Sequence, residues 1–294
     1  MTRAETPRVT VGLPVFNGER YLRAAIEAIR AQTLTDFELI LSDNASTDGT
    51  EAICREYAAR DDRIHYQREE RNIGAAGNFN SVLARARADL FKWAAYDDLC
   101  APELLERCVA AVDARPTTVL AYARTSLIDA DGQPIGSYDD DLDLRGLGRV
   151  GRFRRFHDRF RDGGLVNVQY GVIRTAVLRS TPGLASYPGS DYVLMAELAL
   201  RGEFLEVPDR LFLRRDHPRM TVRAMPSIRE RGAYLDPGRQ GPNRHPYLRM
   251  ASGYLAAVRR VPMKPGERIA CTALVGGFAA RAAARFVKDR LPGR

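Results

Sequence analysis

Two adjacent carboxylates, Asp97 and Asp98, follow a run of apolar and aromatic residues that includes Phe91 and Trp93. A strand of this composition is buried, so its end would place both acids close together at the rim of a sheet. Like charges at that distance need a counter-charge, and a divalent cation such as Mg²⁺ supplies one. The alternative is a solvated turn that caps a helix beginning near Pro102. These residues alone leave both interpretations open.

The elements that would position these acids follow from the hydrophobic periodicity of the first 115 residues. We predict strands over 9–16, 37–41, 63–67 and 90–95, with helices over 20–31 and 51–59 and another after the Gly-rich turn 72–77. Such alternation is typical of a largely parallel sheet covered by helices. Ligands bind beyond the carboxyl ends of parallel strands, so segments 14–17, 43–48, 72–78 and 97–98 should converge on one site.

The pattern is weaker after residue 115. We predict strands over 119–123, 126–128, 171–174, 204–207 and 211–214, and helices over 149–161, 190–200 and 267–290. The acidic run Asp139-Asp140-Asp141 is expected to be a solvated loop. Segment 226–246 is rich in Pro, Gly and Arg and is expected to be a loop or linker.

Composition excludes several classes of protein. The 294 residues carry 45 Lys and Arg against 37 Asp and Glu, and 45% are hydrophobic, which suits a globular fold with a sizeable core. The chain has no apolar stretch of the roughly 18 residues that a membrane span needs and no secretory leader, so we expect a cytoplasmic protein with reduced cysteines. Neither a G-x-G-x-x-G turn nor a P-loop is present, which argues against nicotinamide and phosphate-loop chemistry.

Five ordered segments resemble the N-terminal half of a GT-A-fold, family 2 glycosyltransferase. They read V-x-L-P-V-F-N-G-E-R-Y-L, A-x-x-x-Q-T, F-E-L-I-L-S-D-N-A-S-T-D-G-T, R-N-I-G-A-A-G-N-F-N and F-K-W-A-A-Y-D-D-x-x-x-P-E-L-L-E. The resemblance covers residues 9 to about 110 almost without gaps and extends more weakly to about 218. It implies an α/β fold with a Rossmann-like, mixed and mostly parallel sheet flanked by helices. The catalytic domain would span 1–218, with a nucleotide-sugar-binding half (1–115) and an acceptor and catalytic-base half (116–218), and an Arg-rich linker with a helical extension would follow over 219–294.

The resemblance also implies roles for individual residues. Those implied to line the nucleotide-sugar pocket are Pro14, Phe16, Asn17, Glu19, Asn72, Gly74 and Asn78, together with Asp43, which would accept a hydrogen bond from the base. Asp98 matches the direct ligand of Mg²⁺ or Mn²⁺, and Asp97 would lie near the ribose or a metal-bound water. His217 would complete the metal site, unless the Arg-Arg-Asp-His-Pro turn is a surface corner. The acidic motif is shorter than in many relatives, which leaves open which oxygen does what.

A base that accepts the proton of the attacking hydroxyl is the second requirement of such a transfer. Asp191 is our candidate, because it opens the helix predicted over 190–200, much as the base of inverting relatives sits at a helix start. The helix dipole alone also favours an acid in a first turn. Glu197 is the alternative base.

We therefore expect a metal-dependent, inverting glycosyltransferase that uses a nucleoside diphosphate sugar, UDP being the first choice, and a hydroxyl of a glycan, lipid-linked saccharide or natural product. A sugar-nucleotide nucleotidylyltransferase is one alternative, but it would show a Gly-rich signature loop after the first strand. A nucleic-acid-binding protein is another, and scattered basic residues without an aromatic stacking motif argue against it.

The last 94 residues carry the positive charge, with 20 basic against 8 acidic side chains. The helix predicted over 267–290 combines apolar residues with Arg281, Arg285, Lys288 and Arg290, a combination that suits peripheral contact with an anionic membrane. A helix docked on the catalytic domain is the alternative, because its many Ala and Gly residues favour close packing.

Overall fold

The computed structural model describes residues 6–161, 164–220, 224–225, 227–238 and 246–288, the last five as backbone only. Its strands are β1 (Val9–Val15), β2 (Phe37–Asp43), β3 (Ile64–Arg68), β4 (Leu90–Trp93), β5 (Leu99–Cys100), β6 (Thr118–Ile128), β7 (Pro134–Tyr138), β8 (Val172–Arg174) and β9 (Glu203–Arg215). They form one sheet in the order β3-β2-β1-β4-β8-β6-β9-β5, with β7 beside β6. β3, β2, β1 and β4 run parallel, whereas β8 is antiparallel to β4 and β6. The expected mixed sheet is confirmed.

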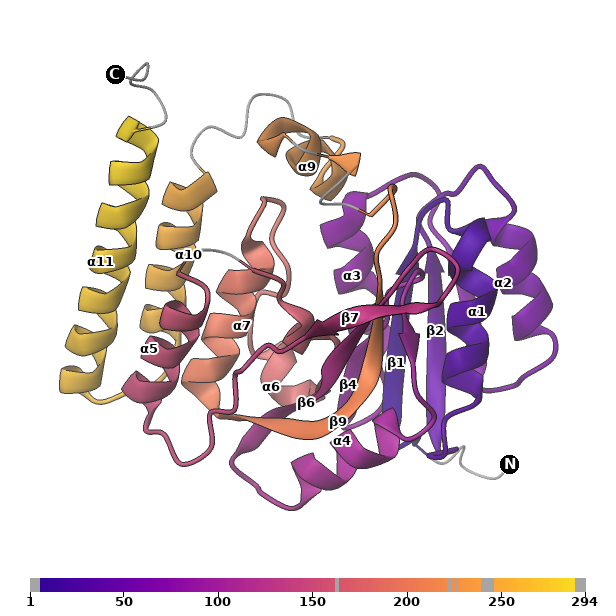
Figure 1. Cartoon of the computed structure of the whole chain (residues 1–294), viewed down its shortest axis with the longest axis horizontal. Coiled ribbons are helices and arrows are strands. Elements are labelled where there is room, and N and C mark those ends of the chain that lie inside the picture. Colours follow the sequence, from indigo (N-terminus) through magenta and orange to yellow (C-terminus); the bar gives the residue numbers. More distant parts are fainter. Residues whose placement is uncertain (1–5, 162–163, 221–223, 226, 239–245, 289–294) are drawn as a thin grey trace.

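Helices cover both faces of the parallel half of the sheet (Figure 1). They are α1 (Glu19–Arg30), α2 (Thr50–Ala58), α3 (Gly74–Arg85) and α4 (Leu104–Asp113). Every residue of β1 and of β2 is buried, as expected for strands with helices on both sides. The predicted strands and helices of this half are all present. α3 begins at Gly74, so most of the segment expected as a turn is the first turn of the helix.

The antiparallel half contains two strands that the sequence predicted as pairs of shorter ones. β6 runs unbroken from Thr118 to Ile128, and its parallel partner β9 from Glu203 to Arg215. The pairing register shifts on both sides of Arg124. A bulge interrupts the alternation of buried and exposed side chains, so one bent strand resembles two separate strands in the sequence.

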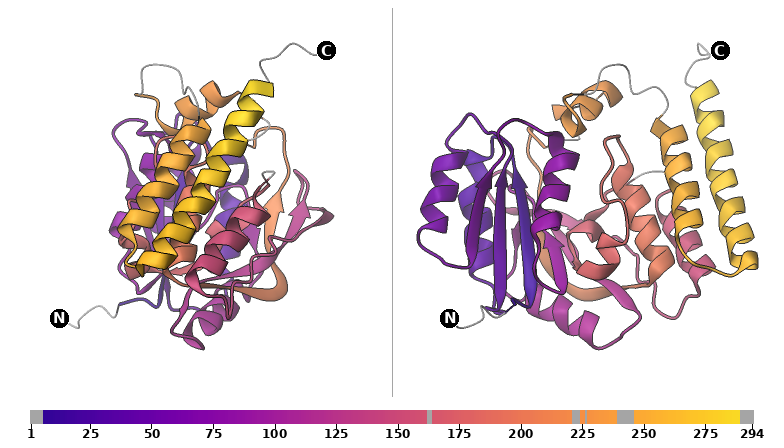
Figure 2. Two further views of the ribbon diagram at one scale, coloured as in Figure 1. Left: turned by 90° about the vertical axis from the view of Figure 1, so that its left-hand side faces the viewer. Right: turned by 180° about the vertical axis from the view of Figure 1, so that it is seen from behind.

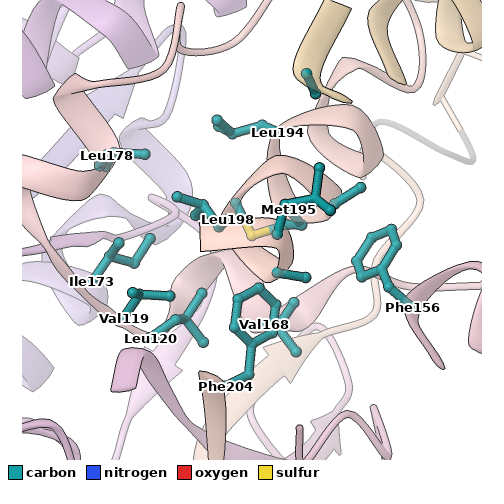
Figure 3. Close-up of a cluster of buried hydrophobic side chains, with 14 of the residues drawn as sticks. Val119, Leu120, Phe156, Val168, Ile173, Leu178, Leu194, Met195, Leu198 and Phe204 are labelled. Atoms are coloured by element: carbon teal, nitrogen blue, oxygen red, sulfur yellow. The ribbon is translucent and has the colours of Figure 1, made fainter. Parts of the chain in front are cut away.

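The remaining core lies between this half of the sheet and a layer of helices. The helical elements are α5 (Arg149–Arg159), the 3₁₀ turn η1 (Asn167–Tyr170), α6 (Thr175–Arg179) and α7 (Ser190–Arg201). Figure 3 shows Leu194, Met195 and Leu198 of α7 above Val119 and Phe204 of the sheet, and all five are buried. α7 is therefore fixed by apolar packing, which holds its first turn in a defined place.

Three helices follow the sheet: α9 (Ile228–Leu235), α10 (Pro246–Arg260) and α11 (Pro265–Lys288). The prediction of a loop or linker over 226–246 was wrong where α9 forms, and the prediction missed α10. Ser227 and Glu230 form a reciprocal capping box that starts α9, and this signal is present in the sequence. α9 lies over the gap between α3 and α10 (Figure 1).

α10 and α11 pack side by side, as Figure 2 shows, and the pair packs on α5 and α7. Cys271 and Val275 of α11 are buried, so one face of this helix is docked on the domain, in line with the alternative to membrane contact. The side chains of Arg285 and Lys288, and all of Arg290, lie outside the described residues. None of the helices that the structure describes is long and apolar enough to span a membrane.

A buried ion pair ties α7 to α10. Glu197 is 1% exposed, and its Oε1 accepts hydrogen bonds from Arg201 at 2.6 Å and from Arg260 Nε at 3.1 Å. Removing one partner of a buried pair leaves an uncompensated charge, which costs far more than losing an exposed pair.

We expect Glu197→Ala to lower the free energy of unfolding by about 2–4 kcal/mol, because it strands the partly buried guanidinium of Arg201. Urea denaturation of the full chain measures the effect. Glu27→Ala, which removes an exposed partner of Arg30, is the matched control and should cost no more than about 1 kcal/mol. Equal losses in the two variants would contradict the role of Glu197 as a buried tie.

Candidate active site

The ends of β1 and β2 are joined to α3 through one buried amide. Asn78 Nδ2 donates to the carbonyls of Val15 at 3.3 Å and Ser42 at 2.9 Å, and its Oδ1 accepts from Ser42 Oγ at 2.6 Å. Asn78 is 2% exposed. It thus holds three segments of the expected nucleotide pocket together from beneath.

The loop after β1 is exposed and is held by the loop after β2. Asn17 has a φ of 52°, and its Oδ1 accepts a hydrogen bond from the backbone N–H of Thr47 at 2.8 Å. Glu19 Oε2 accepts from Gly49 N at 2.6 Å. Pro14 is buried in β1, and Phe16 is half-buried at its end. The four residues predicted from this loop therefore lie together at the end of β1.

Asp43 is fully buried at the end of β2. Its Oδ1 accepts from Ser46 N at 2.8 Å, and its Oδ2 from Tyr66 Oη at 3.2 Å and Arg68 Nη1 at 2.5 Å. Groups of the protein thus engage both oxygens, and the side chain braces the loop after β2. Its contact with a nucleotide base stays a prediction, and it requires Arg68 or Tyr66 to share the carboxylate.

Asn72 and Gly74 form the entry to α3. Asn72 Oδ1 accepts from Asn44 Nδ2 at 3.0 Å and from Gly74 N at 2.8 Å. Gly74 has a φ of +78°, and a Cβ at this position would lie 2.3 Å from the carbonyl oxygen of Leu235 in α9. A glycine is required here both for the backbone conformation and for the close approach of α9.

Asp97 and Asp98 lie in the bend between β4 and β5. Asp98 is only 9% exposed, so the alternative of a solvated capping turn was wrong. Burial, and next the charge of Asp97, raise the pKa of Asp98 to about 7, while Arg214 opposes this shift. Two acids this close, one of them buried, create a strong local demand for positive charge.

The end of β9 supplies the groups that face these acids. Asp98 Oδ1 accepts from the backbone N–H of Arg215 at 2.8 Å, and Asp97 Oδ2 lies 3.0 Å from Nε2 of His217. His217 is 2% exposed and its ring packs on Tyr21, with ring centroids 4.9 Å apart. The surface-corner alternative for His217 was therefore wrong.

The chemistry of these donors fits a hard divalent cation. Asp97 and Asp98 offer carboxylate oxygens, which suit Mg²⁺ and Mn²⁺, and His217 adds an imidazole nitrogen. No group of three or more His, Cys, Asp or Glu side chains is preassembled as a metal site within the described residues. A cation here would thus need further oxygens from a ligand, as Mg²⁺ commonly takes from phosphates.

Arg214 and Arg215 do different work. The Arg215 side chain donates to the carbonyls of Asp97, Asp129 and Ala130 at 2.8–3.1 Å, so it ties β9 to the bend. Arg214 Nη1 donates to Asn167 Oδ1 at 2.5 Å, and its charge acts on both Asp98 and Asp191.

Asp191, the candidate base, lies in the first turn of α7. Burial raises the pKa of its carboxyl, and Arg214 partly offsets the shift. Asp191 and Arg214 both line a cavity of about 760 Å³ beside the strand ends. Glu197 does not line this cavity and is engaged by two arginines, so the geometry favours Asp191 over Glu197 as a group that meets a ligand.

Sequence reasoning missed a buried carboxylate beneath this region. Asp140 was predicted to be solvated but is 0% exposed, and its Oδ1 accepts from the backbone N–H of Asn167 at 3.0 Å. Asn167 in turn accepts from Arg214, so Asp140 supports the residue that orients that guanidinium. Three consecutive acids suggested solvent, and no local signal distinguishes the middle one.

Lys92 is a second missed residue. It is buried within β4, where Nζ donates to the carbonyls of Trp93 at 3.1 Å and Tyr170 at 2.5 Å, and burial lowers its pKa. A lysine between Phe91 and Trp93 was a visible signal, because an isolated charge in a buried strand needs partners.

A family model described as glycosyl transferase family 2 matches residues 10–175. The chain is 41% identical over 105 residues to the putative glycosyltransferase EpsE of Bacillus subtilis, a match that covers 35% of this chain and 38% of EpsE. It is 30% identical over 132 residues to the putative teichuronic acid biosynthesis glycosyltransferase TuaG of the same organism, covering 45% of this chain and 52% of TuaG. The matches thus span about two fifths to half of these relatives.

Two solved structures share the fold over most of the chain. TarS 1–349 of S. aureus, in complex with UDP, has a TM-score of 0.66 at 14% identity and covers 91% of this chain and 70% of its own. The mannosyltransferase PcManGT of Pyrobaculum calidifontis, in complex with GDP-Man and Mn²⁺, has a TM-score of 0.55 at 16% identity, covering 98% and 89%. The GT-A fold expected from the sequence is confirmed.

We expect Asp140→Asn to change how stability depends on pH. The pKa of Asp140 is raised from 3.8 to about 7 in the folded chain, chiefly by burial, so the folded state keeps a proton that the unfolded state loses. Stability from this group is therefore lost as pH rises from about 4 to 7. Relative to the wild type, the variant should gain about 1–4 kcal/mol between pH 5 and pH 8, measured by urea denaturation. A constant difference across that range would contradict the assignment.

Proposed function

Because this chain belongs to glycosyl transferase family 2, we propose that it transfers a sugar from a nucleoside diphosphate donor to a hydroxyl group, with inversion at the anomeric carbon. The observation that carries this proposal is the position of Arg214, whose charge acts on Asp98 and on Asp191. These acids are 93 positions apart in the chain. One guanidinium thus links the group that would receive the donor with the group that would activate the acceptor.

The donor would lie across the carboxyl ends of β1, β2 and β4. Asn17, Glu19 and Asn72 are exposed there, and UDP is our first choice of nucleotide. Support for a nucleoside diphosphate comes from the similar structures, which hold UDP in TarS and GDP-Man in PcManGT. Asp43 would reach the base only after releasing part of its contact with Arg68.

Asp98, Asp97 and His217 are the residues that would hold Mg²⁺ or Mn²⁺. A divalent cation bound there supplies charge stabilisation for the departing diphosphate. Arg214 adds a fixed positive charge on the acceptor side of the same acids. Since both carboxylates are in a water-poor place, their preference for a cation is strong, and the bend itself needs no rearrangement to present them.

Asp191 would accept the proton of the attacking hydroxyl. A raised pKa makes this carboxylate a stronger base than an exposed aspartate, which suits proton abstraction near neutral pH. The position in the first turn of α7 is rigid, because the following turns are packed on the sheet through Leu194, Met195 and Leu198. A rigid base on the acceptor side of Arg214 favours attack from the face opposite the leaving group, hence inversion.

We expect Asp191→Asn to lower the rate of sugar transfer by about 10²–10⁴-fold while leaving the affinity for UDP within a few-fold of wild type, because the amide cannot accept the proton. Nucleotide release in the presence of acceptor measures transfer, and calorimetry measures UDP binding. Asp143→Asn, which changes an exposed acid paired with Arg145, is the control. Turnover near wild type in Asp191→Asn would exclude this residue as the base.

We expect Asp98→Asn to abolish the part of UDP binding that depends on Mn²⁺, because the amide has no charge to offer a cation. Thermal shift of the full chain with UDP, GDP or TDP, with and without excess Mn²⁺, provides the measurement, since a ligand that binds only the folded state raises the Tm. The wild type should show a larger shift with nucleotide and Mn²⁺ together than with either alone. Metal-independent shifts of equal size in both proteins would contradict a cation at Asp98.

A further inference from the structure

The cavity beside Asp191 extends away from the strand ends into the C-terminal helices. Its lining comes from α3, α5, α9, α10 and α11 as well as from the start of α7. Apolar and aromatic residues dominate the part formed by α5, α10 and α11, where the lining includes Phe156, Phe160, Met250, Tyr254 and Phe278. The cavity volume of about 760 Å³ lies in the range that encloses a drug-sized ligand.

A chain of contacts connects Asp191 with this apolar part. The charge of Asp191 acts on Tyr254, whose ring lies 4.6 Å from the ring of His157 and 5.2 Å from the ring of Phe278. Tyr192, the residue after Asp191, stands edge-on to Phe160 with ring centroids 5.2 Å apart. A ligand that fills the cavity can therefore meet the candidate base at one end and aromatic rings at the other.

His157 places one unsatisfied polar atom in this aromatic wall. The residue is 7% exposed, and its Nε2 is buried without a hydrogen-bond partner among the described residues. Nδ1 lies 2.9 Å from the carbonyl oxygen of Phe153, which can only accept, so Nδ1 carries the proton and Nε2 keeps a free lone pair. Burial lowers the pKa of His157 to about 4, so the ring is neutral at physiological pH.

Charged groups around His157 are few. Arg281 of α11 lowers the pKa of His157 and lines the same cavity, and Asp158 acts weakly in the opposite direction. Asp191 is the one carboxylate among the lining residues that the structure describes. The far end of the cavity thus offers aromatic surface and one neutral acceptor atom, and it offers no set of polar groups that would replace the hydration of a free sugar.

We propose that this cavity binds the aglycone of the acceptor, a compact ring-bearing hydrophobic group with a hydroxyl that donates to Nε2 of His157. As the acceptor site, it rests on the proposed glycosyl transfer, because the hydroxyl that receives the sugar would lie at Asp191. Aromatic rings at edge-to-face angles favour a flat ring partner. A donor hydroxyl at Nε2 also satisfies a buried atom that otherwise costs stability.

The test uses binding of small probes to the full chain without donor, so that it does not depend on catalysis. 2-Naphthol carries a ring system and a donor hydroxyl, whereas 2-methoxynaphthalene keeps the rings and cannot donate. In the wild type we expect 2-naphthol to bind roughly 3- to 10-fold more tightly, the value of one neutral hydrogen bond. His157→Phe keeps an aromatic ring in place and should make the two affinities equal.

Controls separate folding, site and function. His65→Phe makes the same exchange on the exposed strand β3 and should keep the preference for 2-naphthol. If Asp191→Asn rather than His157→Phe removes the preference, the hydroxyl meets Asp191 and the proposal fails. If 1-octanol binds and both naphthalene probes do not, the cavity takes an alkyl chain and the proposal fails.

The role as an acceptor site is tested separately from the proposed function. UDP binding with Mn²⁺ tests the donor site, and inhibition of sugar transfer by 2-naphthol tests the cavity. Naphthol binding without any nucleotide binding would support the cavity and overturn the glycosyltransferase. Nucleotide binding without naphthol binding would overturn the cavity and leave the glycosyltransferase standing.

Discussion

Two neighbouring carboxylates held in a largely dry bend are the constraint on which this molecule depends. Burying Asp98 beside Asp97 is unfavourable unless positive charge is brought to them, and the fold brings it from one strand. β9 runs beside the bend and delivers Arg214, the backbone N–H of Arg215 and the ring of His217. The antiparallel pairing of β5 with β9 is what sets these groups opposite the acids.

The second half of the chain is built outward from that contact. Asn167 orients Arg214 and is itself held by Asp140, while α7 carries Asp191 on a base of packed apolar side chains. Helices α10 and α11 then pack on α5 and α7 and enclose the space beside Asp191. The C-terminal helices are therefore part of the wall of the site as well as an extension of the domain.

The parallel half of the fold was predictable because its signals are local. Each strand of β1 to β4 is short and straight, and each ends in a polar cluster, so periodicity gave both the elements and their shared edge. In β6 and β9 the bulge near Arg124 broke the alternation, and the two long strands looked like four. Asp140 and Lys92 could not be placed from sequence in the same way, because their partners, Asn167 and Tyr170, are 27 and 78 positions away. Contacts at such separations leave no periodic trace.

Helix α9 touches both ends of the region described above. The carbonyl of Leu235 rests on Gly74 at the entry to α3, and Ile228, Arg231 and Tyr234 of the same helix line the cavity next to Asp191. A rigid element shared by two ligand sites transmits free energy between them, and this linkage is equal in both directions. Whatever changes the seat of α9 against Gly74 must alter affinity on the far side too, so the two pockets are coupled through a single turn of helix and not only through the chemistry between their ligands.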